Sequence, residues 1–263
     1  MVTLNACLLP SHLRWIFRAH RLCEGLETAA TRVGEALIAH HQSAPFETLH
    51  LQEVFEERAF VILAARAREV GLVHTSGFTR SGLCTFSVHP LRILHEREQR
   101  SLGEARPKAW QAIELGACVH VNVHFASEID GSHPGRVAQA SELAEWIAGC
   151  LAERSEPPQY LLVIGDTNEG EGEQYAVLAR ALGVRPQLQL KPSYRWLRGL
   201  VVARFDRAYL FTSTQSKGES RQGTELTGRV VTDLPDVSDH YAVRFGLPVL
   251  SSPRVGVAVC DDK

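Results

Sequence analysis

Apolar runs that read as β-strands recur along the chain and alternate with helical patterns. The runs are TLNACLL, ETLHLQEV, LCTFSV, CVHVNVHFA, YLLVIGD, ARFDRAYLF and HYAVRFGL. Between them, residues 22–41, 135–154 and 174–182 place their apolar side chains on one helical face. Strands that alternate with helices indicate α/β layering, and this number of strands predicts two sheets packed together.

The length and composition fit one domain of this kind. The chain has 263 residues, of which 44% are hydrophobic and 22% charged, so it can bury a sizeable core. We assign residues 1–250 to the domain and residues 251–263 to a C-terminal tail. Within the domain, segment 212–235 is polar and contains Gly and Ser, which predicts an exposed loop.

Polar side chains interrupt or end most of the apolar runs. YLLVI leads directly into Gly-Asp-Thr-Asn, a sequence that can also form a simple Asx-type turn. The same pattern recurs at Asn5, Glu53, Asn122, His124, Asp166, Asn168, Asp206, Asp239 and His240. Because a buried polar group is costly without a partner, we expect these side chains to converge at one end of the sheets.

The residue types in this set indicate a metal-dependent hydrolase. Glu, Asp and Asn oxygens without a cysteine cluster favour Mg²⁺ over Zn²⁺, with Mn²⁺ as a substitute. A histidine beside a carboxylate is the usual arrangement for a general base near neutral pH. Together they suit hydrolysis of a phosphate ester. The chain carries no phosphate-binding glycine loop, nucleophile elbow or dinucleotide fingerprint.

Net charge, hydropathy and the cysteines indicate which partners and which cellular location to expect. The formal net charge is −2, so no global basic field draws the chain to nucleic acid. No apolar run approaches a membrane span, and the N-terminus does not read as a signal peptide. The six cysteines occur singly, which favours buried free thiols. We expect a cytoplasmic protein that can associate peripherally with a membrane.

The motifs resemble, in order, those of the DNase I-like superfamily of exonucleases, endonucleases and phosphatases. LNACLL is similar to its opening Asn strand, LQEVF to its metal-binding Glu motif and VNVHFAS to its Asn-x-His strand. GDTN resembles its Gly-Asp-x-Asn, FDRAYL its Asp-Arg strand and SDHYAV its closing Ser-Asp-His. The match covers residues 3–247. It implies a catalytic domain built as a four-layer α/β sandwich, with two packed central sheets flanked by helices and the site at one edge.

The resemblance also implies roles around a metal and a base. Glu53 is similar to the principal Mg²⁺ ligand, with Asn5 near the metal and phosphate. Asp239 is assigned to the metal or to orientation. His240 resembles the general base that activates water, and Asp206 the carboxylate that orients it.

The remaining matched positions lie around the phosphate. Asp166 and Asn168 resemble residues that position the attacking water and the phosphoryl group. His124 is similar to the family's second histidine, close to the leaving group or a phosphate oxygen. Asn122, from the same motif, is placed with the substrate-binding residues.

Within the superfamily the chain looks most like the neutral sphingomyelinases. SGLCTFSVHPL resembles their Ser-Gly-Leu-x-x-Phe-Ser segment before His-Pro, although a strand after a turn would look the same. Lys108 in RPKAWQAI and the Arg136-x-x-Gln139 helix start also match. The sequence differs from the family pattern at Thr167 and at Ala208. It also lacks the second histidine that often follows directly after the position of His124. The inositol phosphatase signature before Asp-Arg is absent.

Residues facing the substrate are less defined by the sequence. Tyr194 and Trp196 lie among arginines before the Asp206 strand, where they could contact a lipid interface or stack on bases, or Trp196 could pack in the core. The leading hypothesis is a Mg²⁺-dependent phosphodiesterase that cuts sphingomyelin to ceramide and phosphocholine. The alternatives are a nuclease of the same fold, with nucleic acid as partner, and a catalytically inactive binding module. The sequence leaves the oligomeric state open.

Overall fold

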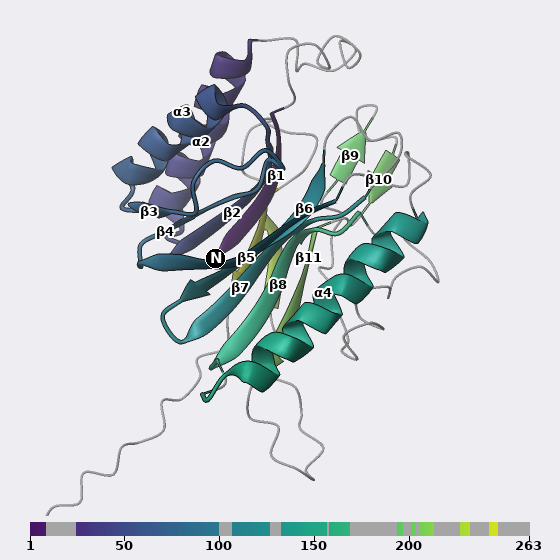
Figure 1. The fold of residues 1–263 in the computed structure, drawn as a ribbon. Helices are drawn as coiled ribbons and strands as arrows, with labels where there is room; N and C mark the ends of the chain where they lie inside the picture. Colours follow the sequence, from purple (N-terminus) through teal and green to yellow (C-terminus); the bar gives the residue numbers. More distant parts are fainter. Residues whose placement is uncertain are drawn as a thin grey trace, which may run out of the picture.

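Two β-sheets pack against each other, and helices cover their outer faces (Figure 1). The computed structural model describes residues 1–8, 25–99, 107–126, 133–156, 158–168, 194–196, 201–203, 206–212, 227–231 and 242–246. The predicted layered α/β architecture with two central sheets is confirmed. Among the described residues, no helix has the length and apolar character needed to cross a membrane.

The first sheet has six strands in the order β12-β13-β1-β2-β4-β3. Its strands are β1 (Val2–Leu8), β2 (Thr48–Val54), β3 (His74–Thr75), β4 (Cys84–Ser87), β12 (Thr227–Val231) and β13 (Ala242–Gly246). β1 and β2 are parallel, and the other pairs are antiparallel. The parallel pair brings Asn5 opposite Gln52, so polar residues of both strands lie side by side.

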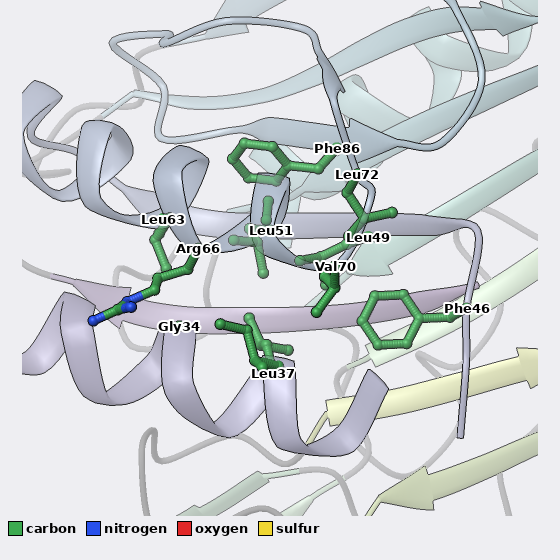
Figure 2. Close-up of a pocket in the computed structure, with 12 residues that line it drawn as sticks. Gly34, Leu37, Phe46, Leu49, Leu51, Leu63, Arg66, Val70, Leu72 and Phe86 are labelled. Atoms are coloured by element: carbon green, nitrogen blue, oxygen red, sulfur yellow. The ribbon is translucent and has the colours of Figure 1, made fainter. Parts of the chain in front are cut away.

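Two helices, α2 (Leu26–Ser43) and α3 (Glu57–Glu69), cover the outer face of this sheet (Figure 1). They bury an apolar layer that includes Val33, Leu37 and Leu63 against Leu49 and Leu51 of β2. Figure 2 shows the small cavity that remains between the helices and the sheet. Its lining is apolar except for Arg66, and the Arg66 guanidinium pairs with Glu35 and Glu69. The cavity is therefore a packing gap without acid–base groups.

The second sheet has five strands in the order β11-β8-β7-β6-β5. Its strands are β5 (Leu91–Gln99), β6 (Lys108–Leu115), β7 (Cys118–His124), β8 (Tyr160–Asp166) and β11 (Asp206–Thr212). Helix α4 (His133–Glu153) lies across its outer face (Figure 1), where Leu143 and Ile147 join a core with Trp110 and Val121. A separate two-stranded sheet joins β9 (Tyr194–Trp196) and β10 (Val201–Ala203).

The structure corrects several predicted elements. The helix predicted over 22–41 begins only at Leu26 and continues to Ser43. The segment 212–235, predicted as a loop, contains strand β12, which pairs with β13. The helix predicted over 174–182 and the tail 251–263 lie outside the described residues.

Other elements are present that the sequence patterns did not reveal. Helix α3 was missed because its buried face is mostly alanine while Val61 on the opposite face is 58% exposed, which hides the amphipathic period. Edge strand β5 was missed because most of its residues are exposed and it has no alternating apolar face.

Candidate active site

Strand β8 ends at Asp166, which lies at the centre of a polar cluster. Its carboxylate is 1% exposed and accepts a hydrogen bond from Asn5 Nδ2 at 2.9 Å. The preceding Gly165 has φ +137, and a Cβ there would lie 2.3 Å from the carbonyl oxygen of Val123. Only glycine therefore allows β7 and β8 to run this close, which places His124 beside Asp166 in the parallel register.

Asn168 closes a tight turn directly after Asp166. Its backbone N–H donates to Asp166 Oδ1 at 2.9 Å, and its Nδ2 donates to the carbonyl of Phe125 at 2.8 Å. The Asx-type turn that the sequence allowed is therefore present, and it is part of the cluster rather than an alternative to it. The turn ties the end of β8 to the end of β7.

Glu53 enters the cluster from the neighbouring sheet. The pairing of β1 with β2 shifts between Asn5 and Leu8, so that two residues of β1 lie opposite Glu53 alone. Glu53 has φ +60, and Cys7 in the bulge has φ +50. The bulge turns the strand ends and aims Glu53 at the other sheet. The side chain of Glu53 is 16% exposed, so it lies on the solvent side of the cluster.

His124 lies between these carboxylates. Its Nε2 is 3.5 Å from Glu53 Oε1 and 3.7 Å from Asp166 Oδ2, and its side chain is 1% exposed. Lys108 Nζ, at the start of β6, lies 2.7 Å from the same Nε2. Which of the two nitrogens donates in this contact depends on the tautomer of the His124 ring. Lys108 thus adds a positive charge to a cluster dominated by carboxylates.

The start of α4 supports the segment that follows His124. The side-chain oxygen of Gln139 accepts a hydrogen bond from the N–H of Ala126 at 2.9 Å. Arg136 donates to the carbonyl of Ala126 at 3.3 Å and is 1% exposed. The Arg-x-x-Gln pattern noted in the sequence therefore places two side chains of α4 on the backbone of Ala126, just after β7. These side chains do not face solvent.

A second polar layer lies behind the cluster, between the sheets. Gln52 Nε2 donates to Asn122 Oδ1 at 2.7 Å and to Thr3 Oγ1 at 3.1 Å. Asn122 Nδ2 donates to the carbonyls of Leu51 and Cys84. The amide of Asn122 is thus committed to protein atoms, and its expected contact with substrate stays a prediction.

A third layer contains two buried histidines. His50 Nε2 lies 3.1 Å from His120 Nδ1. The other ring nitrogen of His50 is hydrogen-bonded to Thr85, and that of His120 to Tyr160. Burial, and then the neighbouring His120, hold the pKa of His50 well below its usual value. Burial, followed by the amino group of Met1, lowers the pKa of His120 to about 3. Both rings are therefore neutral near pH 7.

The structure brings together five of the predicted site residues: Asn5, Glu53, His124, Asp166 and Asn168. The backbone of Asp206 pairs directly with that of Asp166, so it lies at the same sheet edge. Tyr194 and Trp196 belong to β9. Asp239 and His240 lie outside the described residues.

Lys108 is the site residue that the predicted set omitted. The sequence marked Lys108 in RPKAWQAI as a match to the sphingomyelinase branch but gave it no role, because this apolar run is not predicted as a strand. That run forms β6, which pairs with β7 so that Ala109 lies opposite His124. The contact between Lys108 and His124 follows from this pairing, which the sequence pattern alone does not reveal.

The donor set fits a magnesium ion that keeps much of its water. In the described part of the chain, no group of three His, Cys, Asp or Glu side chains is arranged to hold a metal on its own. Mg²⁺ commonly binds through one or two carboxylates and retains several waters, so few protein ligands suffice. Glu53, whose half-buried side chain lies 3.5 Å from His124, stays the predicted magnesium ligand. The buried thiols of Cys7 and Cys84 lie singly and provide no zinc-type site.

Comparisons with known proteins identify the fold. No protein-family model matches the chain, and no curated protein matches it in sequence. Among solved structures, beta toxin from Staphylococcus aureus, a mutant with bound magnesium ions, is 16% identical with a TM-score of 0.68, covering 94% of this chain and 98% of its own. Sphingomyelinase C from Streptomyces griseocarneus is also 16% identical, with a TM-score of 0.64 and the same coverage. The chain has the DNase I-like fold.

A further neighbour widens the range of proteins that share this architecture. Truncated TDP2 from Caenorhabditis elegans is 16% identical with a TM-score of 0.56, covering 84% of this chain and 92% of its own. At these identities the likeness establishes the DNase I-like fold, and the roles of the residues in the polar cluster stay predictions.

Proposed function

We propose that the chain is a Mg²⁺-dependent phosphodiesterase that hydrolyses sphingomyelin to ceramide and phosphocholine at a membrane surface. The observation that carries the proposal is the cluster of Asn5, Glu53, His124 and Asp166, drawn from both sheets to one edge. The structural likeness to a sphingomyelinase C and to beta toxin with bound magnesium supports the substrate class and the ion.

The side chains divide the reaction between them. Magnesium bound at Glu53 would neutralise charge on the phosphoryl oxygens. In the proposed step, His240, oriented by Asp206, takes a proton from water as the water oxygen bonds to phosphorus. The bond from phosphorus to the ceramide oxygen breaks with its electron pair on that oxygen, which takes a proton from solvent, and His240 later releases its proton to solvent. Asp166 and Asn168 position the phosphoryl group.

Lys108 and His124 contribute on the other side of the cluster. The Lys108 ammonium, 2.7 Å from His124 Nε2, supplies positive charge where negative charge develops on the phosphate. His124, between Glu53 and Asp166, lies close to the leaving group or a phosphate oxygen in this proposal. Tyr194 and Trp196 are proposed to contact the lipid interface.

The test is hydrolysis of sphingomyelin, phosphatidylcholine and plasmid DNA by the purified protein, with Mg²⁺ or EDTA. We expect phosphocholine release from sphingomyelin in Mg²⁺ and none in EDTA. Glu53→Gln should weaken Mg²⁺ binding and activity together, because loss of an anionic ligand reduces attraction for a hard cation. Glu57→Gln, the same change at an exposed position of α3, is the matched control.

Two outcomes would contradict the proposal. Full activity in EDTA, or a Glu53→Gln variant that matches Glu57→Gln, would remove the metal assignment. Cleavage of the plasmid without release of phosphocholine would replace the lipid substrate with nucleic acid and leave the site as described.

A further inference from the structure

Gly82, in the loop before β4, contacts the chain directly after Glu53. The carbonyl of Gly82 accepts a hydrogen bond from the N–H of Val54 at 2.9 Å. A Cβ at Gly82 would lie 2.8 Å from Cδ1 of Phe55 and 3.0 Å from the backbone nitrogen of Val54. Gly82 has φ +76, so its backbone conformation also favours glycine. The loop therefore packs closely against the two residues that follow Glu53.

The loop that carries Gly82 is itself closed by hydrogen bonds. Thr79 Oγ1 donates to the carbonyl of Leu83 at 2.8 Å and accepts from its N–H at 3.1 Å. The Ser81 hydroxyl lies 2.9 Å from Thr79 Oγ1, and Ser81 is 0% exposed. The N–H of Gly82 donates to the carbonyl of Thr79 at 3.2 Å. These bonds hold Gly82 in one position relative to the end of β2.

Glu53 requires such support because its backbone is strained. Its φ of +60 is uncommon for a residue with a side chain, and such conformations persist where the surroundings hold them. On one side the bulge of β1 at Cys7 faces Glu53. On the other side, Gly82 holds Val54 and Phe55. The conformation of Glu53 is thus fixed between these two contacts.

We propose that Gly82 is a positioning residue that holds Glu53 in the orientation that binds magnesium. The inference rests on the proposed metal role of Glu53. A side chain at Gly82 would push Val54 and Phe55 outwards and rotate Glu53 away from His124, so metal affinity would fall without the loss of any ligand.

The test compares Gly82→Ala with Gly77→Ala in the full chain. Gly77 lies in the same loop region with φ +83, but a Cβ there meets nothing within 4 Å. Both variants therefore carry the cost of a left-handed alanine, and only Gly82→Ala disturbs the end of β2. The readouts are the Mg²⁺ dissociation constant from calorimetry and the rise in melting temperature on addition of Mg²⁺.

We expect Gly82→Ala to weaken Mg²⁺ binding by about 10-fold, the size seen when residues behind a ligand are changed. Gly77→Ala should stay within about 2-fold of wild type by the same measure. Adding Phe55→Leu to Gly82→Ala should recover part of the affinity, because the ring that a Cβ would strike is removed. If Gly82→Ala does not fold, Phe55→Ala alone removes the contact without a clash and should weaken Mg²⁺ binding several-fold.

The outcomes separate this inference from the proposed function. If Glu53→Gln binds Mg²⁺ like wild type, the metal assignment itself is wrong. If Glu53→Gln loses Mg²⁺ while Gly82→Ala matches Gly77→Ala, the function stands and the positioning role of Gly82 is wrong. Where Gly82→Ala does not fold, wild-type Mg²⁺ affinity in Phe55→Ala contradicts the role equally.

Discussion

At the scale of single residues, backbone strain gathers at the candidate site. Among the residues that the structure describes, the non-glycine residues with left-handed φ are Cys7, Glu53 and Asn168, and all three border the cluster around Asp166. Such conformations cost about 1–3 kcal/mol each. Their concentration at one sheet edge is a physical reason, independent of any resemblance, to regard this edge as functional.

The first prediction concerns Lys108. Lys108→Met removes the ammonium beside His124 but keeps the aliphatic stem that a half-buried lysine packs. We expect turnover on sphingomyelin to fall by about 10², as for loss of one preorganised donor in an active site. Lys108→Arg keeps the positive charge with a different geometry, so its turnover should lie between those of wild type and Lys108→Met.

The measurements for Lys108 are steady-state kinetics and thermal unfolding of both variants. Melting temperatures close to wild type would show that the loss is chemical. Turnover of Lys108→Met within about twofold of wild type would mean that Lys108 only packs against His124 and takes no part in the electrostatic stabilisation of the reacting phosphate.

Residue identities could be predicted from the sequence better than their conformations. Asp166, Asn168 and His124 follow or interrupt apolar runs, and a polar group at the end of a buried strand is a recognisable signal. The left-handed backbone of Glu53 and Cys7 has no such signal, because neither residue type prefers it. It arises from the bulge between two strands that are distant in the chain.

At the scale of elements, β2 and β7 are joined across the two sheets by polar side chains. Gln52 and Asn122 lie on the inner faces of these strands, and both are 0% exposed. Because each buried amide needs its partners, the bonds fix how the first sheet sits on the second. This in turn sets the distance between Glu53 on β2 and His124 on β7.

Asn122→Ala tests this inter-sheet role against a role in substrate binding. Loss of the amide leaves buried groups without a partner, so the unfolding free energy should fall by about 1–3 kcal/mol. A residue that contacts substrate would instead raise KM at unchanged stability. The three bonds of Asn122 favour the first result, which urea unfolding and steady-state kinetics distinguish.

The strands that carry these contacts were accessible to sequence analysis. Apolar runs located β1, β2, β7 and β8, which supply most of the cluster. The pairing of β6 with β7 could not be predicted from the sequence, because β6 was not identified as a strand. Which strands are neighbours in a sheet also depends on contacts that a linear pattern does not record. Lys108 was left out of the predicted site for this reason.

At the scale of the whole molecule, the interior between the sheets is crossed by polar layers. The layer of His50 and His120 is made of ionisable groups that face Thr85, Tyr160 and the amino group of Met1. Cys118 adjoins Tyr160. Two neutral imidazoles share one hydrogen bond there, and a proton added to either ring would be poorly solvated. The fold is therefore coupled to pH at its centre.

The sign of this coupling follows from the direction of the pKa shifts. The pKa of His120 is lowered to about 3 by burial, and that of His50 is also lowered, so the unfolded chain binds more protons than the folded one. Stability from these groups is complete above the unfolded pKa of about 6.5. It is lost as pH falls below that value, towards the folded pKa. The Met1 amino group, lowered to about 6, acts at higher pH, between its unfolded value of 8.0 and about 6.

The final prediction is therefore made between pH 6 and pH 5, below the range of the amino group and above most carboxylates. As the pH falls through this range, each buried histidine should lower the unfolding free energy by up to about 1.4 kcal/mol per pH unit. In the double variant His50→Leu with His120→Leu, this dependence should be strongly reduced, whatever the change in absolute stability. Urea unfolding at the two pH values measures the slope. An equal slope in wild type and the double variant would mean that other groups govern acid unfolding, and that the His50–His120 pair does not link the fold to pH.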